Sequence, residues 1–226
     1  IIKREFNNVL CHSIPQASKS LAIRYAESLN PGFPRLYLDA DIQLNAVDAI
    51  ALIQYAKARS DPALVVPASY IDKQKCHRLV KRFYRAWYQT SSVQELGFGA
   101  GAYLLNKSAR DRFDIWPELI ADDGFVRSQF NTQEIHVLAK YKTYVKAPKD
   151  IFSLINVKTR SKLGNIELNN YLDRSGTSRS QKLPIKRPQT LAKSNKLDKL
   201  VYLVVNLIAL TLAKWQSFTG FKSWSR

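Results

Sequence analysis

The sequence predicts an α/β domain with a mainly parallel sheet flanked by helices. Short apolar runs alternate with segments of helical periodicity through about the first 150 residues, a pattern typical of layered α/β folds. The chain has 226 residues, of which 46% are hydrophobic, and this is enough to bury a core. These observations exclude a disordered chain and a small domain held together by disulfides.

Strands are predicted where short apolar runs are bounded by turn residues. Pro67 is expected to end one strand, because proline cannot donate a hydrogen bond to a sheet ladder. Three glycines within residues 97–101 predict a turn that leads into another strand. The predicted strands are 9–11, 36–38, 63–66, 102–105 and 134–145.

Helices are predicted where apolar residues recur every three or four positions. Asn45 is a favourable N-cap, and Gly164 followed by Asn165 is expected to end the last helix of this region. The predicted helices are 16–28, 45–58, 73–89, 106–113, 124–130 and 150–163.

The C-terminal part of the chain divides into two segments by composition. Residues 171–196 are rich in Ser, Thr, Arg, Lys, Gln and Pro, which predicts a basic flexible linker after a domain spanning 1–170. Residues 197–226 contain an uncharged run from 200 to 213 and then several aromatic residues. Because a bilayer span needs about 20 residues, this run favours a helix associated with the membrane interface, with a buried core helix as the alternative.

Positive charge is concentrated in the C-terminal part. Residues 1–139 hold 17 Lys and Arg against 14 Asp and Glu, whereas residues 140–226 hold 18 against 4. A basic segment of this kind attracts phosphate, which nucleic acid, anionic lipid and phosphorylated small molecules all carry. Cys11 and Cys76 are the only cysteines, so a reducing compartment is favoured.

Asp39 and Asp41 form the strongest chemical signal, because they follow an apolar strand directly. Ligand sites of open α/β sheets lie at the carboxyl ends of parallel strands. Carboxylate oxygens at that position suit a hard divalent cation that also binds substrate phosphates. A pair of solvated acids in a loop is the alternative interpretation.

Asp122 and Asp123 form a second acidic pair at a predicted helix start. Adjacent carboxylates repel, so at least one is expected to have a raised pKa and to suit proton abstraction. Simple capping of the helix is the alternative. Lys19 is a candidate phosphate ligand, although a single Lys on a helix is more often solvated.

Several enzyme classes lack their characteristic motifs in this sequence. The three histidines have no spacing typical of a zinc site. The sequence also contains no G-x-S-x-G, no Walker-type G-K-[ST] and no complete G-x-G-x-x-G motif. Serine hydrolases, P-loop enzymes and Rossmann dehydrogenases therefore lose most of their support.

Four segments together resemble the glycosyltransferases of family 2, which have the GT-A fold. They are residues 18–22, 34–41, 97–101 and 120–127, and the resemblance covers about residues 6 to 170. It implies inverting transfer of a sugar from a nucleotide-diphosphate donor to a hydroxyl acceptor on a glycan or lipid-linked substrate. It also implies that strands carrying the first half of the nucleotide pocket precede Ile1.

The resemblance assigns roles to the acidic residues. Asp39 and Asp41 would hold Mg²⁺ or Mn²⁺ against the diphosphate, and Asp123 would be the general base, with Asp122 beside it. Lys19 falls in the segment that follows the family's nucleotide-binding strands. The basic linker and apolar helix would attach the domain to an anionic membrane surface on the cytoplasmic face, with no nucleic acid as partner.

Two other functions remain open from the sequence. A nucleotidyltransferase that makes sugar nucleotides also uses carboxylates and a metal on an α/β sheet. A nucleic-acid-binding module is suggested by the basic C-terminal part and by the aromatic residues within 73–89, since such residues bind single strands through phosphate contacts and base stacking.

Overall fold

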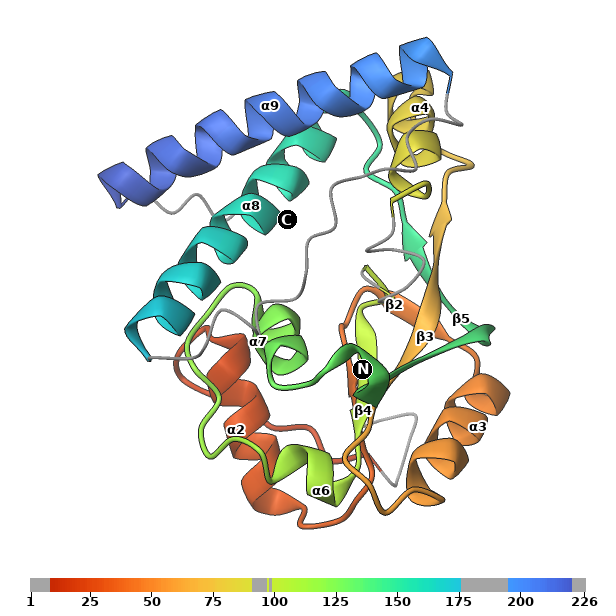
Figure 1. The fold of residues 1–226 in the computed structure, drawn as a ribbon, viewed down its shortest axis with the longest axis vertical. Helices are drawn as coiled ribbons and strands as arrows, with labels where there is room; N and C mark the ends of the chain where they lie inside the picture. Colours follow the sequence, from red (N-terminus) through yellow and green to blue (C-terminus); the bar gives the residue numbers. More distant parts are fainter. Residues whose placement is uncertain (1–8, 91–96, 98, 176–194, 221–226) are drawn as a thin grey trace.

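A computed structural model describes residues 9–90, 97, 99–175 and 195–220 (Figure 1). The fold is mixed α/β, with one five-stranded sheet in the order β1-β4-β3-β5-β2. The strands are β1 (Arg35–Leu38), β2 (Ile42–Leu44), β3 (Leu64–Asp72), β4 (Ala102–Leu105) and β5 (Ile135–Lys146). The helices are α2 (Lys19–Leu29), α3 (Ala46–Lys57), α4 (Arg78–Trp87), α6 (Lys107–Arg110), α7 (Asp122–Ser128), α8 (Ile151–Arg174) and α9 (Lys196–Thr219), with a 3₁₀ turn at Thr132–Glu134.

The prediction of a mainly parallel sheet is wrong for the described residues. β1 with β4, β3 with β4, and β2 with β5 pair antiparallel, and only β3 with β5 is parallel. The turn at residues 39–41 joins β1 to β2, which lie at opposite edges of the sheet and run in opposite directions. An apolar run indicates burial on both faces and carries no information on strand direction.

The central strands are buried on both faces, which explains their continuous apolar runs. Val65 and Leu104 pack with α3 on one face, while Leu64, Val66 and Leu105 pack with α6 and α7 on the other. Successive side chains of a strand point to opposite faces, so each of these residues enters one core or the other. Trp116 is fully buried in the second of these cores.

A third apolar cluster joins α4, α8 and α9 at one end of the molecule (Figure 1). Phe83 of α4, Leu154 of α8 and Val205 of α9 are buried within it. Arg82 of α4 donates a hydrogen bond of 2.9 Å to Asp198 of α9. The C-terminal helix is therefore packed against the body of the protein along its inner face.

Several predicted boundaries differ from the structure. The residues at 9–11 are not a strand, and β3 continues through Pro67 to Asp72 because a register shift falls between Pro67 and Ala68, where proline is tolerated. α8 continues through Gly164 to Arg174, so the linker begins later than position 171, and residues 176–194 lie outside the described residues.

Gly164 lies inside α8, where its missing side chain allows close packing against a neighbouring segment. A Cβ at this position would lie 3.1 Å from the backbone nitrogen of Ala121. The glycine thus lets α8 approach the loop that leads into α7.

α9 is longer than the uncharged run on which its prediction rested, and Gly220 ends it in the left-handed conformation with a φ of 69°. Within the described residues, no helix has both the length and the apolar character that a membrane crossing requires.

Candidate functional site

The turn after β1 places Asp39 beside the start of β4. The backbone N–H of Asp39 donates to the carbonyl of Gly101 over 2.9 Å, and that of Ile42 donates to the carbonyl of Asp39 over 3.2 Å. Gly101 has a φ of +60°, and a Cβ there would lie 2.5 Å from the Ile42 side chain. Only glycine permits this close approach, so the position of Asp39 depends on Gly101.

Lys19 connects two segments that are far apart in the sequence. It is the first residue of α2, behind the N-cap Ser18. Its ammonium lies 2.6 Å from Asp39 Oδ1 and 3.0 Å from both Oδ1 and Oδ2 of Asp122. Burial works against the charge of Lys19, but the two carboxylates outweigh it and raise its pKa.

Asp122 is the buried member of the second acidic pair, with only 4% of its surface exposed. Its Oδ1 accepts a hydrogen bond from Lys19, and its Oδ2 lies 3.0 Å from the same ammonium, an ion contact without hydrogen-bond geometry. Burial is the main cause of a raised pKa at Asp122; Lys19 opposes this effect, and the nearby Asp123 and Asp39 add to it.

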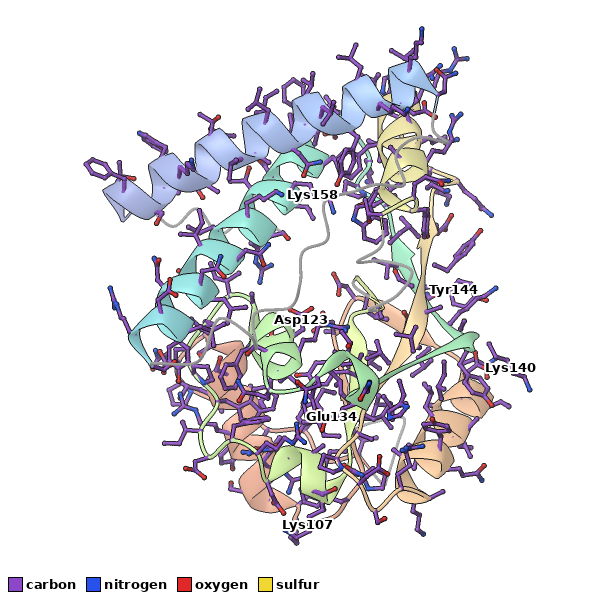
Figure 2. All side chains as sticks on the ribbon, viewed as in Figure 1. Lys107, Asp123, Glu134, Lys140, Tyr144 and Lys158 are labelled. Atoms are coloured by element: carbon purple, nitrogen blue, oxygen red, sulfur yellow. The ribbon has the colours of Figure 1, made fainter. Side chains whose placement is uncertain are left out.

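Asp123 is half-buried, and its carboxylate accepts a hydrogen bond of 2.8 Å from the backbone of Gly124. Figure 2 shows it on α7, in the region between the sheet and α8. Asp41 is exposed on the turn and takes no part in the contacts of Lys19. The structure thus brings Lys19, Asp39 and Asp122 into direct contact, with Asp123 adjacent in the chain.

Tyr103 is a member of this region that sequence reasoning missed. Its side chain is buried and stacks on Tyr37 with 5.0 Å between the ring centroids, and its hydroxyl has no partner among the described residues. Burial, followed by the charges of Asp122 and Asp123, raises its pKa well above the usual range. A tyrosine in an apolar strand gives no sequence signal for this placement.

A buried ion cluster around Glu27 fixes α2 in place. Arg110 donates one hydrogen bond of 2.9 Å to Oε1 of Glu27 and two, of 2.9 and 3.2 Å, to Oε2. The guanidinium of Arg35 lies 3.0 Å from Glu27 Oε1. Trp116 Nε1 and the Tyr37 hydroxyl also donate to this carboxylate. Because Lys19 is on the same helix, the cluster helps to set the position of the candidate site.

The residues present fit a divalent cation that shares its ligands with a phosphorylated substrate. The described residues contain no group of three or more metal-binding side chains. Mg²⁺ is nevertheless commonly held by one or two carboxylates together with substrate phosphates and water. The half-exposed carboxylate of Asp39 and the Oδ2 of Asp122, which accepts no hydrogen bond from the described residues, provide hard oxygen donors of that kind.

Two of the aromatic residues of α4 are buried, whereas Trp87 and the adjoining Tyr88 are half-buried. Phe83 and Tyr84 are buried in the cluster shared with α8 and α9, so their rings have no face available for a base. The Lys158 ammonium lies 5.1–5.6 Å from the ring centroids of these two residues and of Trp87. Packing therefore accounts for Phe83 and Tyr84, two of the aromatic residues on which the nucleic-acid alternative rests.

Two shallow hollows have volumes of about 320 and 330 Å³, and neither is lined by a residue of the two acidic pairs, 39/41 and 122/123. The first is lined by Arg59, Asn106 and Asp111 among others, and the second by Tyr70, Lys73 and Arg85 among others. Neither combines a cation with two converging carboxylates, so the Lys19 cluster is the better candidate on chemical grounds.

Comparison with known proteins gives no assignment. No model of a known protein family matches the chain, and no curated protein matches it either.

Proposed function

We propose that this chain belongs to a metal-dependent, inverting glycosyltransferase with a GT-A-like fold, which transfers a sugar from a nucleotide-diphosphate donor to a hydroxyl. One observation carries the proposal: the ammonium of Lys19 contacts Asp39 and Asp122, which are 83 positions apart in the numbering. Asp39 at the end of a strand, the acidic pair Asp122 and Asp123, and the candidate phosphate ligand Lys19 therefore lie close together.

The donor side of the site consists of Asp39, Asp41 and Lys19. Asp39 and Asp41 would hold Mg²⁺ or Mn²⁺, which neutralises charge on the diphosphate leaving group when bound. Lys19 is half-exposed, so its ammonium can donate hydrogen bonds to phosphate oxygens from the solvent side. These contacts would stabilise the negative charge that develops as the sugar leaves.

The acceptor side consists of Asp123, supported by Asp122. Asp123 is the more accessible of the two and has a carboxylate oxygen for the proton of the acceptor hydroxyl. As this proton moves to Asp123, the acceptor oxygen forms a bond to the anomeric carbon. The bond from that carbon to the diphosphate oxygen breaks, and its electron pair leaves with the diphosphate. A single displacement of this kind inverts the anomeric centre.

The outer face of α9 supports a membrane location for the acceptor. Its large apolar side chains are exposed while Val205, Ala209 and Ala213 face the protein, and exposed Lys196 and Lys214 flank the apolar part. An apolar face with basic borders suits the surface of an anionic membrane. The exposed apolar residues are Leu197, Leu200, Leu203, Val204, Leu207, Ile208, Leu210, Leu212, Trp215 and Phe218.

Release of nucleotide diphosphate from a panel of nucleotide sugars, with Mn²⁺ and a glycan or lipid-linked acceptor, tests the proposal. Asp123→Asn is expected to slow turnover about 10²- to 10⁴-fold, the usual contribution of a general base, and Asp39→Asn to abolish the metal-dependent rate. Asp111→Asn is the matched control, because Asp111 is an exposed acid whose ion pair with Lys107 lies on α6.

The same assay separates the two enzyme classes. Pyrophosphate release from a nucleoside triphosphate and a sugar phosphate, without turnover of any nucleotide sugar, would establish the nucleotidyltransferase instead. Equal turnover by the Asp123→Asn and Asp111→Asn variants would refute the role of Asp123.

A further inference from the structure

The ammonium of Lys19 occupies one of the two oxygens, Oδ1, that Asp39 could offer to a divalent cation. It lies 2.6 Å from Asp39 Oδ1, which is a close, charge-assisted contact. A second cation on the same carboxylate would be held within a few ångströms of this ammonium and would be repelled by it. Lys19 and a divalent cation therefore compete for Asp39.

The cluster is also incompletely satisfied. The hydroxyl of Tyr103 is buried, with 6% of the residue's surface exposed, and has no hydrogen-bond partner among the described residues. Asp122 Oδ2 is in ion contact with Lys19 over 3.0 Å but accepts no hydrogen bond from these residues. Buried polar groups are normally paired. A buried hydroxyl without a partner, close to the charges of Asp122, Asp123 and Asp39, indicates that the cluster accommodates an additional polar ligand.

We propose that Lys19 is an exchangeable internal cation that couples the binding of metal to the binding of the nucleotide diphosphate; this inference rests on the proposed function. Lys19 keeps its contact with Asp122, because that buried carboxylate has no other cation in contact with it among the described residues. It leaves Asp39 to a divalent cation and donates to the diphosphate oxygens. The flexible four-carbon side chain permits this movement from a fixed helix start.

This exchange makes the two ligands cooperative. Without nucleotide, a metal ion displaces Lys19 from Asp39 and nothing replaces the lost contact. With nucleotide, the phosphate oxygens replace it, so the metal binds more tightly, and by linkage the metal strengthens nucleotide binding by the same factor.

Mn²⁺ binding, followed by the electron paramagnetic resonance signal of the free ion, tests the exchange without any turnover. Lys19→Met is expected to raise the affinity for Mn²⁺ alone about tenfold or more, the scale on which a neighbouring charge alters the ionisation of a carboxyl group. Lys19→Arg keeps the positive charge and is expected to bind Mn²⁺ alone as weakly as the unaltered protein. Lys107→Met is the control, because Lys107 is an exposed lysine in an ion pair with Asp111.

The same titration tests where the additional affinity for Mn²⁺ arises and whether Mn²⁺ binding is coupled to nucleotide binding. Adding Asp39→Asn to Lys19→Met is expected to remove the gain. In the unaltered protein, UDP or GDP, each tested separately, is expected to strengthen Mn²⁺ binding by a larger factor than in Lys19→Met.

An unchanged affinity for Mn²⁺ alone in Lys19→Met, or a gain that survives Asp39→Asn, would overturn the exchange. Turnover of a nucleotide sugar together with that result would leave the glycosyltransferase proposal standing. A gain at Asp39 without turnover of any nucleotide sugar would support the exchange and count against the glycosyltransferase.

Discussion

Acid sensitivity of folding is predicted from the buried cluster around Glu27. Burial alone would raise the pKa of Glu27, but the hydrogen bonds it accepts, first among them those from Arg110, outweigh burial and lower the pKa from 4.5 to about 2. Its side chain is only 11% exposed, so solvent screens these contacts weakly. One pKa unit corresponds to about 1.4 kcal/mol, and the lowering therefore corresponds to about 3 kcal/mol of stability.

The sign follows from comparing the folded and unfolded states. The folded-state pKa of Glu27 is depressed, so its contribution is fully present above the unfolded pKa of 4.5. It is lost progressively as the pH falls from about 4.5 toward 2, because the folded protein must then take up a proton at a carboxylate that binds two arginines. Stability is therefore expected to decrease with acid in this window.

Urea unfolding of the unaltered protein and of Glu27→Gln at pH 7, 5, 4 and 3 measures the effect. At pH 7 the variant is expected to lose about 3 kcal/mol or more, because breaking a buried pair leaves unpaired charges behind. The difference between the two proteins should shrink as the pH falls below 4.5.

Glu118→Gln provides the control for this experiment. Glu118 pairs with Arg24 and is 57% exposed, and exposed pairs contribute about 0–1 kcal/mol. A loss for Glu27→Gln that is the same at every pH, or no larger than that of Glu118→Gln, would show that the cluster does not stabilise the fold through its charge.

Three further substitutions test other parts of the structure. Gly101→Ala is expected to lower the free energy of unfolding by about 1–3 kcal/mol, since a Cβ there meets Ile42 at 2.5 Å and φ is +60°; an unchanged urea midpoint would contradict the turn. Tyr103→Phe is expected to leave stability equal or raise it by about 1 kcal/mol, because it removes an unpaired buried hydroxyl; a large loss by the same measurement would reveal a partner for that hydroxyl. Leu207→Glu is expected to weaken co-sedimentation with phosphatidylglycerol vesicles about tenfold, since a buried Leu contributes ~1.5–3 kcal/mol, while Val47→Glu, at an exposed position on α3, should have no effect.

Local sequence signals predicted most elements of this fold. Asn45 caps α3 as expected, with its side chain accepting a hydrogen bond from Val47, and the apolar runs at 36–38 and 102–105 lie within β1 and β4. These features depend on neighbours in the chain, such as a free N–H at a helix start or a stretch of buried side chains. They are therefore visible in a window of a few residues.

The features that were not predicted depend on contacts between distant segments. Gly164 gives the same local signal whether it ends a helix or allows close packing, and only the approach of Ala121 shows which applies. The pairing of Glu27 with Arg110 joins residues 83 positions apart. For the candidate site, each acidic pair was recognisable by itself, but the common contact of Asp39 and Asp122 with Lys19 depends on the turn at 39–41 and on the position of α2.

The balance of charge around Lys19 argues that this cluster does more than stabilise the fold. Among the described residues, Lys19 interacts with Asp39 and Asp122, and the buried Arg127 with Asp123. Three carboxylates against two cations leave an excess of negative charge. For stability alone, one acid per cation would suffice, and a buried carboxylate next to others is unfavourable, as the raised pKa of Asp122 reflects. A further cation bound at the half-exposed Asp39 would offset this excess, and the proposed metal-assisted transfer requires such a cation.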